Sequence, residues 1–192
     1  MKILVTGGAG YIGSHMTRML VDRGYDPIVL DTLEFGHRQA LPPQTRVIVG
    51  NVGDPAVIAH VLKDHTIDGV LHFAGYIQVE ESVRLPIKYM NNNVIAPIAL
   101  LEGMRKARVK HVIFSSTAAL YGNPKTALIS EDHPKNPVSP YGLSKWMFEE
   151  LLRVYDRSWG IKSVSLRYFN AAGASLNGAY GEMHTPESHL IP

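Results

Sequence analysis

Short apolar runs alternate with amphipathic segments along nearly the whole chain, and this alternation restricts the possible folds more than any other feature. Six runs have the length and character of buried strands: residues 3–5, 28–30, 47–49, 70–73, 112–114 and 164–166. Four segments have helical periodicity: residues 12–23, 55–64, 86–107 and 141–158. This alternation predicts an α/β fold with a doubly wound parallel sheet, whose ligands bind at the carboxyl ends of the strands.

Prolines and glycines mark the boundaries of these elements. Asp54 and Pro55 form a favourable helix start, because the carboxylate caps the helix and proline suits its first turn. Pro97 lies inside the segment 86–107 and should kink that helix or split it in two. Turn signals stand at Gly24, at Pro42 and Pro43, and in the proline-rich stretch 124–140.

The composition is that of an ordinary globular protein, in which 45% of the 192 residues are hydrophobic and the net charge is +2. No run of like charges forms a patch for nucleic acid or a membrane surface, so we expect neither as a partner. The absence of cysteine excludes disulfides and thiolate metal sites, and we expect no metal. The start, MKILVTGGAG, is too interrupted for a signal peptide, and no apolar stretch approaches the ~18 residues of a membrane span. These features predict a cytoplasmic protein.

Three glycines follow the first predicted strand and open the first predicted helix: Gly7, Gly10 and Gly13. Glycines at such a turn let the backbone approach a pyrophosphate, whose negative charge is attracted to the helix N-terminus. Asp31 ends the second predicted strand, 18 residues past Gly13, where a carboxylate can bind ribose hydroxyls. The pattern indicates a dinucleotide site, and the alternative is a glycine-rich turn with a capping aspartate.

The carboxylate of Asp31 also bears on which dinucleotide binds. It would repel the 2′-phosphate of NADP, so we expect NAD as the cofactor. His37 and Arg38 could weaken this preference, because both can carry positive charge close to the ribose.

Tyr141 and Lys145 lie four residues apart in the stretch SPYGLSKW, so they share one face of the last predicted helix. A tyrosine with a pKa near ~10 is a poor base, but a nearby ammonium and an oxidised nicotinamide would favour its phenolate. With the glycine loop upstream, the pair indicates a general base that removes a hydroxyl proton while a hydride leaves the same carbon. Without that loop, the same spacing would be structural.

The stretch FSSTAALYG ends the fifth predicted strand with three hydroxyl side chains. Ser115 and Thr117 would lie at the ligand-binding edge, where a nicotinamide and a substrate oxygen meet. For Ser116 we expect the plainer role of capping backbone groups.

Seven stretches together resemble the extended short-chain dehydrogenase/reductase family, and within it the epimerases of UDP-sugars: TGGAGYIGSH, HFAGYIQVEESV, NNNV, FSSTAALYG, SPYGLSKW, LRYFNAAGA and ESHLIP. The resemblance implies a Rossmann-type domain with Thr117 as the catalytic hydroxyl, Tyr141 as the base and Lys145 as the supporting cation. The side chains and backbone that it implies for the NAD site are Gly7, Gly10, Tyr11, Ile12, Gly13, Asp31, Thr32, Asn51, Val52, Phe73, Ala74, Gly75, Asn92, Ser115, Tyr141, Lys145 and Phe169. It implies that the nucleotide sugar meets Thr117, Tyr141, Asn170 and His189.

Two alanines separate this chain from one branch of that family. The sugar-nucleotide 4,6-dehydratases place an Asp-Glu pair directly after the threonine, where this chain has Ala118 and Ala119. Without that pair, the resemblance implies a 4-keto sugar that takes its hydride back on the other face. The implied reaction is the NAD-dependent interconversion of UDP-glucose and UDP-galactose in galactose metabolism. Open alternatives are a UDP-N-acetylhexosamine or UDP-glucuronate epimerase, a reductase, and a non-catalytic NAD-binding module.

Four positions depart from the pattern of these epimerases. Thr32 and Phe35 stand where many of them carry asparagines beside the ribose. Asn51 replaces an aspartate that meets the adenine amino group, although its carbonyl oxygen could accept the same hydrogen bond. Ile77 stands where some members have a lysine that reaches the pyrophosphate. We therefore expect NAD to be held less tightly than in those relatives.

The resemblance also implies how the chain is organised. Residues 1–170 would form the NAD-binding domain, and residues 171–192 would begin the nucleotide-sugar region, which continues in the family as a second, smaller domain. We expect this chain to bind NAD but to bind the sugar weakly.

The family forms homodimers through the helices that correspond to residues 86–107 and 141–158. In the second of these segments, Leu143, Met147 and Val154 lie opposite the predicted catalytic face. This apolar outer face predicts a homodimer, and the alternative is that local side chains cover it.

Overall fold

The structure is a computed structural model that describes residues 1–176, 178 and 180–183. Its centre is a six-stranded sheet in the order β3-β2-β1-β4-β5-β6, in which every neighbouring pair is parallel. The strands are β1 (Lys2–Thr6), β2 (Asp26–Asp31), β3 (Arg46–Val49), β4 (Gly69–His72), β5 (His111–Thr117) and β6 (Lys162–Tyr168). All six predicted strands are confirmed, and so is the doubly wound fold class.

The strand order places the chain reversal between β1 and β4. The chain runs outward from β1 to β3, crosses back to β4 and then runs outward again to β6. Thr6 at the end of β1 pairs in register with His72 at the end of β4. Ligands of such sheets bind outside the carboxyl ends of the strands at this switch point.

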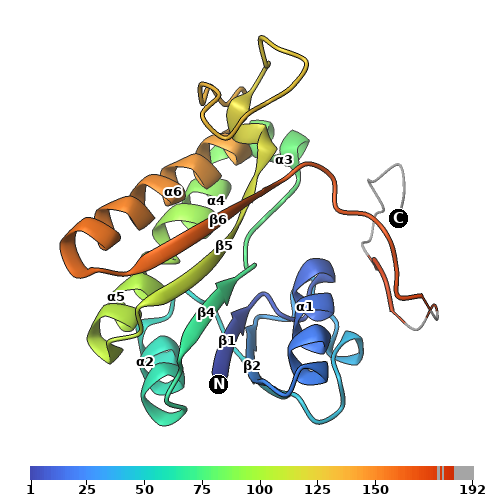
Figure 1. Cartoon of the computed structure of the whole chain (residues 1–192), viewed down its shortest axis with the longest axis vertical. Coiled ribbons are helices and arrows are strands. Elements are labelled where there is room, and N and C mark those ends of the chain that lie inside the picture. Colours follow the sequence, from blue (N-terminus) through green and yellow to red (C-terminus); the bar gives the residue numbers. More distant parts are fainter. Residues whose placement is uncertain (177, 179, 184–192) are drawn as a thin grey trace.

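Helices cover the two faces of the sheet unequally (Figure 1). One face carries α1 (Tyr11–Asp22), whereas the other carries α2 (Pro55–Asp64), α5 (Ile98–Ala107) and α6 (Pro140–Trp159). Alternate strand residues feed two cores. Leu4, Ile28 and Val70 pack with Phe114 and Phe148 on the α2, α5 and α6 face, and Val5, Val29 and Leu71 pack on the α1 face.

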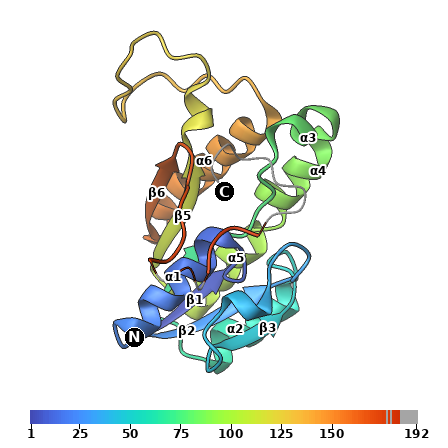
Figure 2. The ribbon, with the colours of Figure 1, turned by 90° about the vertical axis from the view of Figure 1, so that its right-hand side faces the viewer.

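The outer part of the α1 face has less cover. Among the described residues no helix lies over β5 and β6 on this face, and Figure 2 shows these strands from the side. Val164 of β6 is accordingly 55% exposed and Ile113 of β5 is 37% exposed.

The sequence located most helices and missed one. The range predicted for α2 is exact, and its cap is confirmed, because the Asp54 carboxylate accepts hydrogen bonds from the backbone N–H groups of Ala56 and Val57. The predicted segment 86–107 is split, as Pro97 indicated, into α4 (Pro86–Met90), a π-helical turn η2 (Asn91–Ile95) and α5. The helix α3 (Val79–Arg84) was not predicted, because six residues before a proline are too few for an apolar period.

Two short 3₁₀ turns complete the described elements. They are η1 (Arg38–Ala40) in the connection from β2 to β3 and η3 (Ala118–Tyr121), which follows β5 directly. Among the helices of the described residues, none has the length and apolar character that crossing a membrane requires.

Candidate cofactor and substrate site

The three glycines after β1 differ in how strictly the surrounding structure requires a glycine. Gly7 has φ +67°, and a Cβ there would lie 2.4 Å from the backbone nitrogen of Ala74. A Cβ on Gly13 would lie 2.2 Å from the carbonyl oxygen of Gly7. A Cβ on Gly10 would make only an ordinary contact, 3.4 Å from the same oxygen. The fold therefore requires Gly7 and Gly13, whereas the space beside Gly10 is left open by the protein and suits a ligand that approaches the backbone closely.

The start of α1 has no side-chain cap, unlike the starts of α2 and α6. Asp54 caps α2 and Ser139 caps α6, but the N-cap of α1 is Gly10, which has no side chain to donate to. The first-turn N–H groups of Tyr11 and Ile12 are thus available to an external acceptor, at the end of the helix that favours negative charge. This combination suits a phosphate group.

Asp31 links the second strand to the glycine loop. Its carboxylate is 8% exposed and accepts hydrogen bonds from the backbone N–H groups of Ala9 and Leu33, both at 2.9 Å. Each carboxylate oxygen can accept further bonds, so the two backbone contacts orient the group and leave acceptor capacity for ribose hydroxyls. Asp31 therefore also has the structural role of a capping aspartate, which was the alternative to a dinucleotide site.

Arg38 was a candidate for placing positive charge close to the ribose, but its guanidinium is bound elsewhere. Its guanidinium donates hydrogen bonds to the carbonyl oxygens of Pro43 and Thr45, each at 3.1 Å. The turn that precedes β3 therefore holds the charge of Arg38. Arg38 does not offset the preference for NAD that Asp31 is expected to give.

The residues expected around the adenine and ribose lie on two turns. Thr32 accepts the N–H of Glu34 at 3.3 Å, and the Oδ1 of Asn51 accepts the N–H of Gly53 at 2.7 Å. The oxygen predicted to meet the adenine amino group thus already has one donor, although a carbonyl oxygen can accept two. Val52 beside it is buried.

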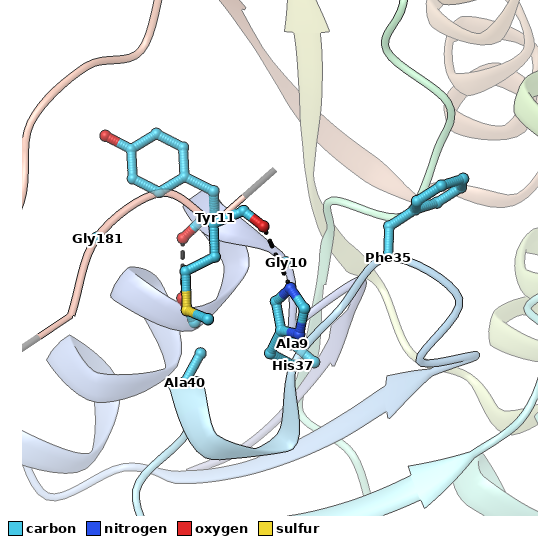
Figure 3. Close-up of a pocket in the computed structure, with 9 residues that line it drawn as sticks. Ala9, Gly10, Tyr11, Phe35, His37, Ala40 and Gly181 are labelled. Atoms are coloured by element: carbon cyan, nitrogen blue, oxygen red, sulfur yellow. Dashed lines mark hydrogen bonds between the residues drawn. The ribbon is translucent and has the colours of Figure 1, made fainter. Parts of the chain in front are cut away.

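A small pocket joins the glycine loop to the last part of the described chain. Ala9, Gly10 and Tyr11 line one side of it, and Phe35 and His37 project from the connection after β2 (Figure 3). The remaining wall comes from Gly181 and Met183, and the ring of His37 is hydrogen bonded to the carbonyl oxygen of Met183. The hydroxyl of Tyr11 donates to the carbonyl oxygen of Gly173 at 2.6 Å. The start of the predicted nucleotide-sugar region therefore rests against the start of α1.

The loop after β4 connects the two halves of the site. The N–H groups of Phe73 and Ala74 both donate to the carbonyl oxygen of Thr6, at 2.9 and 3.1 Å. A Cβ on the next residue, Gly75, would lie 3.3 Å from the Nζ of Lys145. The predicted NAD-site residues 73–75 thus run from the glycine loop to the catalytic helix.

Asn93 is a site residue that the sequence reasoning missed. It is buried, its Oδ1 accepts the N–H of Tyr76, and its Nδ2 donates to the carbonyl oxygen of Tyr76 and to the hydroxyl of Ser144 on α6. Asn92, which was predicted instead, donates to the Oδ1 of Asn93. The available signal was the run of three asparagines inside an otherwise apolar helical segment, which is unfavourable in a helix unless the amides have partners.

Thr117, Tyr141 and Lys145 come together at the end of β5. The ammonium of Lys145 is buried and donates to the carbonyl oxygen of Ser115 at 2.9 Å. The Thr117 oxygen accepts the N–H of Ala119 at 3.1 Å, and the Thr117 hydroxyl lies close enough to Tyr141 to lower the pKa of the tyrosine. The backbone contact uses one acceptor site of Thr117 and leaves its hydroxyl proton available to the tyrosine oxygen.

Burial dominates the acid–base properties of this group. It raises the pKa of Tyr141 above its ordinary value, and the hydrogen bond with Thr117 offsets only part of that change. The expected preference for the phenolate involves both the neighbouring ammonium and an oxidised nicotinamide, and it stays a prediction. In the structure the Nζ of Lys145 lies 6.0 Å from the ring centre, and desolvation is the largest effect on this pKa. Burial also lowers the pKa of Lys145 to about 8. His72, buried at the end of β4, has a pKa of about 3 through burial and the charge of Lys145, so it is neutral.

The remaining predicted residues lie away from these contacts. Phe169 and Asn170 follow β6 and are exposed, and His189 lies outside the described residues. Ser116 does not cap the backbone as expected, because its hydroxyl donates to the buried carboxylate of Glu149 on α6 at 2.5 Å. Among the described residues no group of three His, Asp or Glu side chains is arranged to hold a metal ion.

Because the ammonium of Lys145 is buried, we expect the protein to become more stable when it is removed. Replacing Lys145 by methionine should raise the free energy of unfolding at pH 7 by about 1–3 kcal/mol, because an apolar group of similar length avoids the desolvation of a charge. The folded pKa of about 8 lies below the ordinary 10.5, so the unfolded chain binds the extra proton between these values and the native protein gains stability as pH rises. Denaturant unfolding of both proteins should therefore show a difference that shrinks from pH 8 upward. A variant less stable than the native protein at pH 7 would mean that the bond to Ser115 outweighs desolvation.

Comparison with known proteins agrees with this geometry. The chain is 52% identical over 192 residues to a UDP-glucose 4-epimerase of Lactobacillus helveticus, covering 100% of this chain and 58% of that relative. It superposes on the UDP-glucose 4-epimerase of Brucella ovis in complex with NAD with a TM-score of 0.96 and 42% identity, covering 98% of this chain and 58% of that one. The enzyme from Bifidobacterium longum, solved with NAD⁺ and UDP, gives a TM-score of 0.88 and 40% identity, over 95% of this chain and 57% of the other.

The chain thus spans about 58% of the length of the curated relatives it matches. The family description "NAD dependent epimerase/dehydratase family" matches residues 3–192, which is nearly the whole chain. The chain therefore belongs to the NAD dependent epimerase/dehydratase family.

Proposed function

We propose that this chain belongs to an enzyme that interconverts UDP-glucose and UDP-galactose through a 4-keto sugar, with NAD as its cofactor. The observation that carries the proposal is the buried group of Thr117, Tyr141 and Lys145 at the end of β5, followed directly by Ala118 and Ala119. NAD supplies the chemistry by accepting a hydride from the sugar and returning it.

The residues fit a dinucleotide laid across the carboxyl ends of β2, β1, β4 and β5. Asp31 would bind the adenosine ribose, and the uncapped start of α1 beside Gly10 would bind the pyrophosphate. Lys145 would lie beneath the nicotinamide half, next to Gly75. The fit rests on the open space at Gly10 and on backbone N–H groups that no side chain of the described residues caps.

Tyr141 would take the proton of the C4 hydroxyl as general base, with the Thr117 hydroxyl bridging to the same oxygen. Working as a base near pH 7 requires the pKa of Tyr141 to fall by ~3 units, or ~4 kcal/mol of differential interaction, although burial alone raises it. An adjacent cationic nicotinamide can supply that interaction in a dry site, whereas a neutral one cannot. Tyr141 is therefore a base only beside the oxidised cofactor and returns its proton beside the reduced one.

Ala118 and Ala119 support epimerisation over elimination. Both belong to η3, immediately after Thr117, and neither methyl side chain can protonate or deprotonate the sugar. Loss of water from the sugar needs such an acid and base. Return of the hydride is then the route left to the 4-keto sugar, and inversion follows when the other face is presented.

An apolar groove supports a homodimer as the assembly. Leu143, Met147 and Val154 of α6 are 36%, 42% and 42% exposed, and with Val94 and Ile98 they line a groove between η2, α5 and α6. A second copy of this face would bury these side chains. The cytoplasmic location stays a prediction from the cysteine-free sequence.

The reaction is tested by replacing Tyr141 with phenylalanine. The native protein should gain absorbance in the NADH band with UDP-galactose or UDP-glucose, and the variant should lose this rate by about 10²–10⁴-fold, because only the base is removed. The affinity for NAD, measured by calorimetry, should change less than about threefold. A response only to UDP-N-acetylhexosamine or UDP-glucuronate would identify an enzyme for that sugar, and no effect of the variant on any sugar response would indicate a binding module.

The cofactor site is tested by two glycine variants. Gly10→Ala should weaken NAD binding at least about tenfold while changing the free energy of unfolding by less than about 1 kcal/mol, because its methyl group enters space meant for the ligand. Gly7→Ala should instead destabilise the protein by about 2 kcal/mol or more, because it combines a positive φ with a backbone clash. Equal NAD affinity in Gly10→Ala and the native protein would contradict the proposed path of the cofactor.

The dimer is tested with Met147→Glu, which places a charge in the apolar groove. Sedimentation equilibrium should give a dimer for the native protein and a monomer for this variant. Arg157→Gln, in the last turn of the same helix, lowers the net charge by the same amount and is the control for a change of charge alone. A native protein that sediments as a monomer at all concentrations would refute the assembly.

A further inference from the structure

An ion pair between a buried carboxylate and a partly buried guanidinium joins the helix and the strands that carry the proposed catalytic groups. Glu149 of α6 is 3% exposed and accepts two hydrogen bonds from Arg167 of β6, from Nε at 3.1 Å and from Nη2 at 2.8 Å. Ser116 of β5 donates to the same carboxylate. One carboxylate therefore connects α6, β5 and β6 at a depth where water cannot compete.

The far side of the guanidinium holds a loop. The Nη1 of Arg167 donates to the hydroxyl of Tyr121 at 2.7 Å and to the carbonyl oxygen of Glu131 at 2.9 Å. Tyr121 ends η3, and Glu131 lies in the long connection between η3 and α6 that projects beyond the sheet in Figure 1. The pair thus also fixes the segment that leads into the catalytic helix.

These contacts bracket both proposed catalytic oxygens along the chain. Thr117 lies between Ser116, which the carboxylate holds, and Tyr121, which the guanidinium holds. Tyr141 lies between the anchored loop and Glu149, two helical turns further along the same face of α6. Neither Glu149 nor Arg167 is needed as an acid, a base or a ligand contact in the proposed reaction.

A stability role alone does not explain the pair well. Buried ion pairs seldom stabilise a fold more than apolar side chains of the same size, because desolvation offsets their attraction. Their directional hydrogen bonds do restrict geometry, and a bidentate guanidinium restricts it most. The geometry that matters here is how the Thr117 hydroxyl lies relative to the Tyr141 oxygen, because this neighbour lowers the pKa of Tyr141.

We propose that Glu149 and Arg167 are a positioning pair that sets how the Thr117 hydroxyl and the Tyr141 oxygen lie relative to one another, by anchoring the chain on both sides of each residue. Their effect on turnover rests on the proposed function, whereas their effect on the Thr117–Tyr141 contact does not. Because neither side chain touches the reacting atoms, both act through β5 and α6.

The test removes the pair without changing the net charge, in the variant Glu149→Gln/Arg167→Gln. The NADH-band rate with a UDP-sugar should fall about 10–100-fold, and NAD affinity should stay within about threefold, because the glycine loop is not involved. A matched control is Glu150→Gln/Arg153→Gln, which removes an exposed ion pair from the same helix and should leave both values unchanged.

A second readout reports the contact itself and does not depend on turnover. Tyrosine labelled with ¹³C at Cζ, assigned with Tyr141→Phe, gives the pKa of Tyr141 by NMR titration. This pKa should rise in the double variant, because Thr117 would move away from the position in which it favours the phenolate. The other titratable groups beside Tyr141 are Lys145 and Tyr89, and both are unchanged in the variant.

Two milder variants decide the case if the double variant does not fold. Tyr121→Phe removes only one partner of Arg167 and should raise the pKa of Tyr141 less than the double variant would. Arg167→Lys keeps the charge but loses the bidentate geometry, so it should resemble Tyr121→Phe. Unchanged titration and rate in the folded variants would overturn the positioning role. A native protein that responds to no UDP-sugar, even at concentrations that saturate the weak sugar site expected of this chain, would refute the proposed function, and the NMR titration would still test the pair.

Discussion

The site depends on one close approach between two backbones. A Cβ on Gly7 would lie 2.4 Å from the nitrogen of Ala74, so the loops after β1 and β4 can meet only if residue 7 is glycine. The next residue along the second loop, Gly75, lies against Lys145. A line of contacts thus runs from the glycine loop through Ala74 and Gly75 to the catalytic helix. The distance between the proposed phosphate and nicotinamide ends of the site is set by backbone, which varies far less than side-chain contacts.

One face of α6 concentrates groups that a folded protein normally keeps in water. Tyr141, Lys145 and Glu149 follow one another at helical spacing and are all largely buried. Burial disfavours the charged form of each group, which is why the lysine has a lowered pKa and the tyrosine a raised one. Phe148 and Leu152 beside them pack into the main core and offset this cost. One set of residues therefore stabilises the helix, and a different set carries its proposed function.

The sequence predicted the elements that depend on local patterns. Short apolar runs located the strands, and Asp54 with Pro55 located α2 to the residue, because caps and strand periodicity are local. The glycine loop and the group of Thr117, Tyr141 and Lys145 were also foreseeable, since each is compact in sequence.

Contacts between distant residues were not foreseeable in this way. Asn93 meets Ser144 across 51 positions, and Glu149 meets Arg167 across 18, and no local pattern connects such pairs. The raised pKa of Tyr141 was not foreseeable for the same reason, because it depends on how deeply the fold buries the ring. Arg167 lies in the stretch LRY, directly after the predicted strand 164–166, and this position indicated that an acidic partner such as Glu149 had to exist.

The π-helical turn at Asn91–Ile95 has a consequence for how this region can change in evolution. Such a turn holds one residue more than an α-helical turn, and each residue of an α-helix turns the chain by about 100°. A turn with one extra residue leaves the segments on either side in nearly the orientation that a plain α-helical turn would give them. If one residue were deleted here, Tyr89 of α4 would therefore keep its orientation relative to Leu100 and Met104 of α5, all of which are fully buried. The loss would fall on the asparagines of the turn, among them Asn93, which is hydrogen bonded to the backbone of Tyr76. This segment can therefore change its length by one residue at the expense of its polar contacts and not of the core.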